Sequence, residues 1–470
     1  MIKPFSVKLD RSAKTPLAEQ IRLAIGAAIE GGVLVSGARL PSWQDLAAQL
    51  GVARGTVRTA YERLSAAQLI VASRATGTRV AERPRLAARP EAPPDPGSFM
   101  EIYQEMNRGP ALFQMGVPAA EIFPATLLAR LRAQAVRAET SASLVYPDPR
   151  GEIELRREIA GYLAVSRGID CSPAQVIITS GFAGGLGLAL RVLRLEGRKA
   201  WIEEPGFPFT RKGLELAGLT AAPVPVDADG IDLDYGFAHC PEAKLVVVTP
   251  GQQAPLGVTL SLDRRLRLLD WAGRQNAWVI EDDYLSELQL KGRAAPALAS
   301  LDRAGRVIHI GSFSKTISPG LRLGFLVVPA SLLTRFAEIA ACLAPAPGPS
   351  VQLATAAFLR DGHYMRHLRR TKRAYATKRE MLLKCLQSYD EARHVTTAGL
   401  AALLFLPDGA PDLKIVRECF GFGMAPAPLS AFYARPEPPR SGLLLSIATA
   451  PGKQLARSCD RLFEIIERFI

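Results

Sequence analysis

The sequence has no apolar run that approaches the roughly 20 residues needed to cross a bilayer. Residues 1–10 carry charge and contain no apolar segment of the kind found in a signal peptide. Internal repeats of the solenoid type are also absent. We therefore expect neither membrane insertion nor export, and predict a soluble protein of the cytoplasm.

Cysteine is scarce and scattered. The six cysteines, at positions 171, 240, 342, 385, 419 and 459, form no CxxC pair and show no other spacing typical of metal ligands. This pattern argues against a disulfide framework and against a zinc site. We predict structural thiols and no metal.

Basic residues are in excess, with a net charge of +13, which suggests a polyanionic partner. The chain is long enough, at 470 residues, for two or three domains with a sizeable core. Residues 1–83 contain twelve Lys or Arg and six Asp or Glu, so +6 of the charge lies in less than a fifth of the chain. A nucleic-acid surface is expected there.

Proline divides the chain. Five prolines fall within residues 82–98, too many for a helix or an interior strand, so this segment predicts a semi-extended linker. We assign residues 1–81 to a first domain, 82–110 to the linker and 111–470 to a second domain.

The first domain shows the pattern of three helices. Apolar residues recur every four positions over 17–29. A second helix is predicted to begin at Ser42, with Asp45 as its capping-box partner, and to end at Gly51. A third follows over 52–64, and the short turn between these two is typical of a helix-turn-helix.

A basic hairpin is predicted over 69–82, with Arg74 and Arg79 around Gly77. Together with the helices it forms the pattern of a winged helix-turn-helix, in which the last helix enters the major groove. Arg54 or Arg58 would reach guanine edges and phosphates. The alternative is a small helical bundle with solvated arginines, but the full order of elements favours DNA binding. The DNA-binding residues that this pattern predicts are Arg54, Thr56, Arg58, Arg74 and Arg79.

This first domain resembles the GntR family of DNA-binding domains. The resemblance is carried by PLAEQIRLAIGAAIEGGVLVSGARLPSWQDLAAQLGVARGTVRTAYERL. One departure is Trp43-Gln44, where the family usually has Ser-Arg and the arginine touches DNA. The resemblance implies a double-stranded DNA operator as a partner, with contacts to it from Ser42 and Gln44 as well.

The second domain alternates short β-branched runs with helical segments. The clearest predicted strands are 176–179, 245–250, 277–283 and 306–311. This alternation predicts an α/β fold with a mostly parallel sheet.

Four segments of this domain carry chemistry suited to pyridoxal 5′-phosphate (PLP). The segment GSFSKTISPGLRLGF (311–325) offers a lysine amine for an aldehyde, and serines and an arginine for a phosphate. EDDY (281–284) ends a strand with carboxylates that could pair with a protonated pyridine nitrogen. TSGFAGGLGLAL (179–190) begins a glycine-rich helix suited to phosphate, and EEPGF (203–207) ends on an aromatic ring. Each of these four segments, taken separately, also has a purely structural explanation, but their occurrence together in this order favours a cofactor site.

Together these segments resemble fold-type I PLP proteins of the aminotransferase type, and the GntR-type head resembles the MocR/GabR/PdxR group of regulators. FQMGVPAAEIFP (113–124), YPDPRGEIELRREIAGYL (146–163), TPGQQAPLG (249–257) and GHYMRHLRRTKRAY (362–375) extend the resemblance. It implies that Lys315 is the Schiff-base lysine, Asp282 pairs with the pyridine nitrogen, Tyr284 lies near the phenolic oxygen and Phe207 stacks on the ring. It also implies that Phe182, Ala183, Ser312, Ser314 and Arg322 hold the phosphate, and that the protein is a head-to-tail homodimer.

Positions that would handle an amino-acid substrate depart from the group. Gln252 and Ala401 stand where histidine is usual, and Leu256 stands where threonine is usual. Residues 441–450 contain no arginine, although aminotransferases of this fold place their carboxylate clamp in the corresponding strand. Loss of a bidentate arginine weakens the case for efficient transamination.

Three hypotheses follow. The leading one is a transcription regulator that senses PLP, or a PLP adduct of a small amine or amino acid, as its effector. The second is a working aminotransferase that carries a DNA-binding head. The third is an interaction protein with a decayed pocket and no cofactor.

Overall fold

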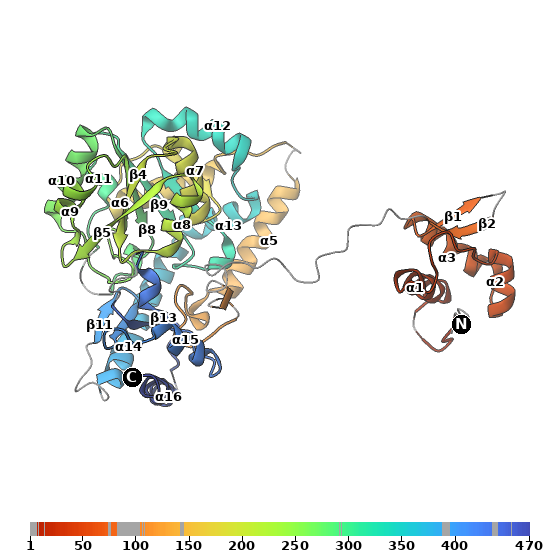
Figure 1. Cartoon of the computed structure of the whole chain (residues 1–470). Helices are drawn as coiled ribbons and strands as arrows, with labels where there is room; N and C mark the ends of the chain where they lie inside the picture. The colour runs from red at the N-terminus through yellow and green to blue at the C-terminus, as the bar shows by residue number, and fades with distance from the viewer. Residues whose placement is uncertain are drawn as a thin grey trace. The chain divides into compact units, whose positions relative to one another are not determined.

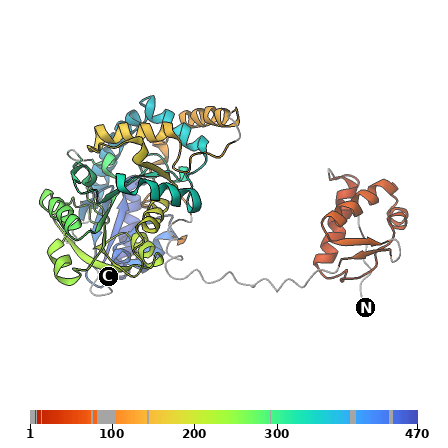
Figure 2. The same ribbon diagram turned by 90° about the horizontal axis from the view of Figure 1, so that it is seen from above.

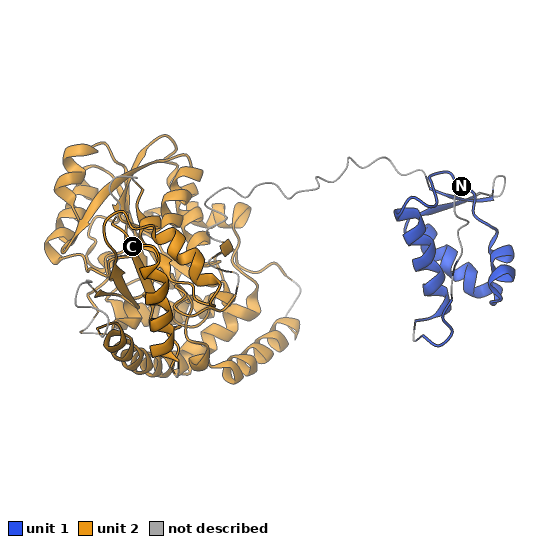
Figure 3. Ribbon diagram, turned by 60° about the horizontal axis from the view of Figure 1, so that its bottom comes forward, with its two compact units in different colours: residues 1–100 blue, residues 101–470 orange. Residues whose placement is uncertain are grey.

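The structure is a computed structural model of the chain, and two compact units make it up. It describes residues 7, 9–13, 15–73, 77–81, 104–105, 107, 109–141, 145–290, 292, 294–387, 395–434, 440–452 and 454–470. Unit 1 spans Met1–Met100 and is called the head here, and unit 2 spans Glu101–Ile470 and is called the large unit (Figure 3). Of the predicted linker, residues 82–103, 106 and 108 lie outside the described residues.

The head consists of three helices and a hairpin (Figure 1). The helices are α1 (Leu17–Glu30), α2 (Trp43–Leu50) and α3 (Arg54–Ala66). Strands β1 (Ile70–Ser73) and β2 (Gly77–Val80) pair antiparallel, so that Ile70 lies opposite Val80. This order confirms the predicted winged helix-turn-helix.

The core of the head comes from one face of each helix. Ile21 and Ile25 of α1 and Val57 and Leu64 of α3 are each fully buried in a single cluster. Their spacing of four residues in α1 and seven in α3 places them on one side of each helix. Tyr61, also buried, donates a hydrogen bond from its hydroxyl to the Pro41 carbonyl oxygen at 2.9 Å.

The cap of α2 differs in detail from the capping box predicted for it. The Ser42 hydroxyl oxygen accepts from the Asp45 backbone N–H at 3.1 Å, as an N-cap should. The Asp45 carboxylate then accepts from the Ser42 hydroxyl at 2.6 Å. In a capping box the carboxylate would instead accept from the Ser42 backbone N–H. Aspartate, one methylene shorter than glutamate, bonds the nearer hydroxyl.

The large unit is built on an eight-stranded sheet with the order β3-β10-β9-β8-β7-β4-β5-β6. Strands β4, β5, β7, β8 and β9 run parallel, whereas β10 is antiparallel to both β3 and β9, and β6 is antiparallel to β5. The predicted α/β fold with a mostly parallel sheet is therefore confirmed. The strands are β3 (Val176–Thr179), β4 (Lys199–Glu204), β5 (Thr220–Asp227), β6 (Gly230–Ile231), β7 (Leu245–Val248), β8 (Trp278–Asp283), β9 (Val307–Ser312) and β10 (Gly324–Val327).

Helices cover both faces of this sheet (Figure 2). Along β3, Val176 and Ile178 point into one core cluster and Ile177 into another, so both faces are buried. The helices of this part are α5 (Ala125–Ser141), α6 (Ile153–Arg167), α7 (Phe182–Leu193), α8 (Pro208–Leu216), α9 (Leu233–His239), α10 (Leu262–Arg274), α11 (Leu298–Leu301), α12 (Leu333–Leu343) and α13 (Pro349–Arg360).

A second, antiparallel sheet follows in the order β11-β12-β14-β13. Its strands are β11 (Val395–Ala398), β12 (Ala401–Phe405), β13 (Ala427–Pro428) and β14 (Gly442–Ser446). It packs with α14 (His363–Gln387) and α15 (Asp412–Phe420), and α16 (Leu455–Glu467) packs on these two helices. Within the described residues, no helix is both long and apolar enough to cross a membrane.

The separate cores generate a prediction. Ile25→Ala removes a fully buried side chain from the core of the head, and should lower the free energy of unfolding of the head by about 2–5 kcal/mol. The matched control is Leu23→Ala on the same helix, whose side chain is 50% exposed and whose cost should stay within about 0.5 kcal/mol. Thermal unfolding of the full chain measures both. An equal shift for the two variants would contradict the prediction.

Candidate functional site

Three strands bring the predicted cofactor segments to one edge of the sheet. Gly324 of β10 lies opposite Thr179 of β3 on one side and opposite Ser312 of β9 on the other. A side chain at Gly324 would come within 2.9 Å of the Gly181 Cα and of the Gly311 carbonyl oxygen. The segments that follow β3 and β9 therefore meet at the carboxyl ends of these strands, where open α/β sheets bind ligands.

The start of α7 forms one side of the predicted phosphate site. Gly181 precedes the helix with φ 84°, a backbone conformation that favours glycine. Phe182 and Ala183 then open the first turn, where backbone N–H groups have no partner within the helix and attract anions. The Arg322 guanidinium donates to the Ser180 carbonyl oxygen at 3.0 Å, which holds it beside this turn.

Two serines after β9 form the other side. The Ser312 hydroxyl donates to the Ser314 hydroxyl oxygen at 3.1 Å and accepts from the Ser314 backbone N–H at 3.2 Å. Because Ser312 is in register with Gly324 and Thr179, these hydroxyls lie at the same sheet edge as the start of α7. Amides, hydroxyls and one guanidinium there match the donors that a phosphate dianion requires.

Lys315 lies in the turn directly after β9. Its Nζ donates to the Gly116 carbonyl oxygen at 2.8 Å. A Cβ on Gly116 would lie only 2.8 Å from this nitrogen, and the φ of +85° at Gly116 also favours glycine. Burial lowers the pKa of Lys315 to about 8, against the opposing effect of the Asp282 carboxylate. A larger neutral fraction at neutral pH makes this amine a better nucleophile than an ordinary lysine.

Asp282, at the end of β8, is a buried carboxylate that accepts no hydrogen bond from the described residues. Burial raises its pKa well above the ordinary value, and the charges of Asp283 and Glu203 add to the effect. A protonated ring nitrogen would supply the missing donor and the opposite charge. Burial, followed by the charge of Asp282, also raises the pKa of the adjacent Tyr284 hydroxyl.

Phe207 is the predicted stacking residue and caps the start of α8. Its ring is edge-to-face with Phe182, at 6.1 Å between centroids, and lies 5.2 Å from the Phe209 ring. With 37% of the residue exposed, a face remains accessible to a ligand. The orphan carboxylate, the amine and the phosphate donors fit a phosphorylated pyridine aldehyde, so the residues present fit PLP.

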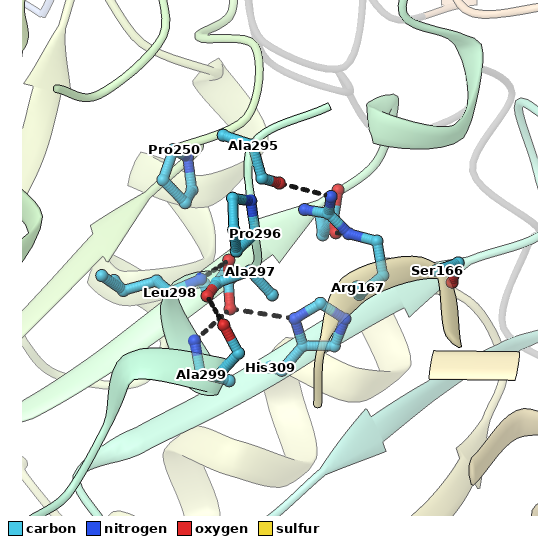
Figure 4. Close-up of polar contacts among 12 residues, drawn as sticks. Ser166, Arg167, Pro250, Ala295, Pro296, Ala297, Leu298, Ala299 and His309 are labelled. Carbon is cyan, nitrogen blue, oxygen red and sulfur yellow. Dashed lines mark hydrogen bonds and ion pairs between the residues drawn. The ribbon is translucent and has the colours of Figure 1, made fainter. Parts of the chain in front are cut away.

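The sequence did not indicate the polar network that positions Asp282. On one side of it, Glu281 accepts from the backbone N–H groups of Leu298 at 2.6 Å and Ala299 at 2.9 Å, and pairs with His309 Nδ1 at 3.0 Å (Figure 4). These contacts hold β8 to the start of α11 and to β9.

On the other side, Arg167 Nε donates to the Asp283 carboxylate at 2.7 Å, and its Nη1 donates to the Ala295 carbonyl oxygen at 2.7 Å (Figure 4). The two side chains of this pair are 3% and 5% exposed. The acidic run EDD was a signal for such a network, but nothing in the sequence identified a partner 116 residues away.

Glu203 at the end of β4 was also missed. Its carboxylate accepts from the Thr249 backbone N–H at 3.0 Å, the Thr249 hydroxyl at 2.6 Å and the Gln253 amide at 3.3 Å. Burial raises the pKa of Glu203 to about 7, against these hydrogen bonds. Its charge adds to the rise in the pKa of Asp282 and of Tyr284.

The positions that depart from the family pattern meet on one side of the site. Ala401 belongs to an apolar cluster that also contains Leu444 of β14, and Leu256 packs against this cluster. Met115, next to the Gly116 that accepts from Lys315, packs on the same cluster. Gln252 is buried and donates its amide to the Leu285 carbonyl oxygen at 3.0 Å. Apolar side chains thus occupy this flank of the site, and β14 offers no cation to a carboxylate.

The head presents most of its predicted DNA-binding residues on its surface. Arg54 and Arg58 of α3 are exposed and Thr56 is half-buried, while Gln44 of α2 is exposed. Arg58 pairs with Glu62 at 2.9 Å. Ser42 is exposed, but its hydroxyl is engaged with the Asp45 carboxylate.

The wing carries Arg79, which is exposed and donates to the Gly37 carbonyl oxygen at 2.9 Å. Arg74 lies outside the described residues. An additional basic residue, Arg39, pairs with Arg79 through a β-bridge and places its guanidinium beside Gly77. The RLP sequence that contains Arg39 offered no residue-level signal for this contact.

Two family descriptions match the chain. Residues 17–80 match the gntR family of bacterial regulatory proteins, and residues 114–440 match aminotransferase class I and II. The probable rhizopine catabolism regulatory protein MocR of Rhizobium meliloti is 33% identical, over 97% of this chain and 94% of that protein. The pyridoxine biosynthesis transcriptional regulator PdxR of Corynebacterium glutamicum is 32% identical, over 86% and 85%.

Solved structures resemble the large unit. LysN of Thermus thermophilus, an α-aminoadipate aminotransferase complexed with N-(5′-phosphopyridoxyl)-L-leucine, is 27% identical with a TM-score of 0.70. The match covers 78% of this chain and 94% of that one. An archaeal alanine:glyoxylate aminotransferase is 25% identical with a TM-score of 0.72, over 79% and 94%.

The buried ion pair yields a prediction. Arg167→Met leaves the Asp283 carboxylate buried without its counter-ion, and should lower the free energy of unfolding of the large unit by about 3–5 kcal/mol. Arg157→Met removes an exposed arginine from the same helix and is the control, with an expected change within about 0.5 kcal/mol. Urea unfolding compares the two. If Arg167→Met costs no more than the control, the pair does not position β8 as argued.

Proposed function

Since this chain belongs to the MocR/GabR/PdxR group of GntR-type transcription regulators, we propose that its large unit binds PLP on Lys315 and thereby controls DNA binding by the head. The sensed molecule is PLP itself or its product with a small amine. When bound, PLP supplies an aldehyde that condenses with primary amines.

One observation carries the proposal: the residues that would hold the cofactor are complete while those that would hold an amino acid are not. Lys315, with its pKa lowered to about 8, would hold the aldehyde carbon, and Asp282 would accept a hydrogen bond from the protonated ring nitrogen. Tyr284 would lie near the phenolic oxygen and Phe207 on the ring. The phosphate would be held by Phe182, Ala183, Ser312, Ser314 and Arg322.

The apolar flank favours a ligand without an α-carboxylate. In this fold an arginine of the strand corresponding to β14 would fix that carboxylate, and here Leu444 of β14 is buried in the apolar cluster instead. A carboxylate placed there would lose water without gaining a bidentate partner, which costs free energy. Steady transamination, the alternative function, is disfavoured for the same reason because it requires an oriented amino acid.

In the head, α3 would lie in the major groove with Arg54 and Arg58 toward the bases. Gln44, Arg39 and Arg79 are exposed and would contact phosphates. By analogy with the group, the working form would be a head-to-tail homodimer, which suits an operator with two half-sites.

Lys315→Ala tests the sensor proposal. The variant should lose the visible absorption band that PLP gives when joined to a lysine, and its operator binding should no longer respond to added PLP in gel-shift and reporter assays. Lys378→Ala is the control, since this lysine pairs with Glu121 and the Ala448 carbonyl oxygen outside the site. If Lys315→Ala leaves both operator binding and its PLP response unchanged, the proposal is wrong. Absence of the band in the purified natural protein would instead favour an interaction protein without cofactor.

The ligand class has its own test. An apolar primary amine, such as phenethylamine, should displace Lys315 and shift the absorption band at lower concentration than phenylalanine, which differs from it by the α-carboxylate. Turnover of phenylalanine with 2-oxoglutarate at about 1 s⁻¹ or faster would instead support a working aminotransferase. A stronger response to phenylalanine than to the amine would show that a carboxylate partner exists in the site.

A further inference from the structure

One helix of the large unit carries an unusual share of the charge. Residues 1–83 account for +6 of the net charge of +13. Helix α14 alone, with eight Lys or Arg and the single acidic residue Glu380, accounts for +7, so the remaining residues sum to zero. The basic excess of this protein therefore lies in two places: the head and α14.

The charge of α14 is concentrated on its exposed face. Its apolar side is fixed to the large unit by buried residues that include Tyr364, Leu368 and Tyr375. Opposite them lies what we call the arginine face, formed by Arg366, Arg369, Arg370 and Arg373. These arginines are exposed and line a surface groove with Ala374 and Thr377. Spacings of three and four residues place them in one stripe about 10 Å long.

The arginine face has no counter-ions among the described residues. Arg366 contacts the Asp361 carbonyl oxygen and His363, and Arg370 contacts the Glu121 carbonyl oxygen. In the part of the chain that the structure describes, no carboxylate lies within ion-pair distance of the four guanidinium groups. Some exposed arginines elsewhere do pair, as Arg58 does with Glu62 and Arg461 with Glu464. Like charges at these spacings destabilise a helix, so the fold itself gains nothing from the stripe.

We propose that the arginine face of α14 binds the sugar–phosphate backbone of duplex DNA, outside the segment that the head reads. This inference rests on the proposed function, in which the head binds DNA. Because the head and the large unit belong to one chain, DNA bound by the head has a high effective concentration near α14. Guanidinium groups pair with phosphate oxygens through parallel hydrogen bonds, and duplex DNA offers phosphates in a regular row. Such contacts position DNA and add affinity without reading its sequence.

The test uses the full chain loaded with PLP and a random-sequence DNA duplex. Binding is measured between about 50 and 200 mM salt for the natural protein and for R366Q/R369Q/R370Q/R373Q. The slope of log K against log salt should become shallower by about 0.9 for each lost phosphate contact, so by about 2 to 4 per chain. The matched control, R130Q/R132Q/R137Q/R157Q, removes four exposed arginines from α5 and α6 and should leave the slope unchanged.

Three outcomes would overturn the inference. The first is an unchanged slope in the α14 variant, and the second is an equal change of slope in the control. The third is an α14 variant that binds DNA as the natural protein does but no longer binds an acidic peptide such as poly-glutamate. R54Q/R58Q, which alters the head, separates this inference from the proposed function. If R54Q/R58Q loses DNA binding while the α14 variant keeps the natural slope, only the inference fails. The PLP absorption band and thermal unfolding confirm that each variant is folded, and R369Q/R373Q repeats the test with fewer changes.

Discussion

Burying Asp282 at the end of β8 costs free energy, because its carboxylate loses water and receives no hydrogen bond from the described residues. The neighbours of Asp282 stabilise the strand around it. Glu281 is bonded by two backbone N–H groups and by His309, and Asp283 is paired with Arg167. β8 is thereby fixed on both sides of the carboxylate that we propose for the ring nitrogen. The lowered pKa of Lys315 arises from its burial in the same part of the large unit.

This arrangement separates two tasks that an aminotransferase performs together. The cofactor groups lie at the carboxyl ends of β3, β8 and β9, where strand register alone brings them together. The groups for an amino acid would come from the small sheet, and there β12 and β14 contribute Ala401 and Leu444 to an apolar cluster. This contrast supports the proposal of a sensor over that of a catalyst, because transamination requires an oriented substrate.

Much of the fold could be predicted because its signals are local. The apolar spacing of Ile21 and Ile25, the cap at Ser42 and the β-branched run of β3 each act within a few residues, and each element lies where the pattern indicated. Lys315 and Asp282 could be predicted as cofactor residues because the residue types around them, within a few positions in the sequence, indicate that chemistry. Arg167, Glu203 and Gly116 were not, since each acts through a partner more than forty residues away.

The sequence by itself determined the two kinds of domain, the GntR-type head and the PLP-type large unit, because helix periodicity, strand composition and residue type are properties of the chain. Only the tertiary structure decided which charges are paired. Arg167 and the arginines of α14 look alike in the sequence, yet packing buries Arg167 against Asp283 and leaves the arginine face exposed without a carboxylate among the residues described. The reason is physical: a salt bridge requires two atoms to lie within a few ångströms, and folding alone sets that distance.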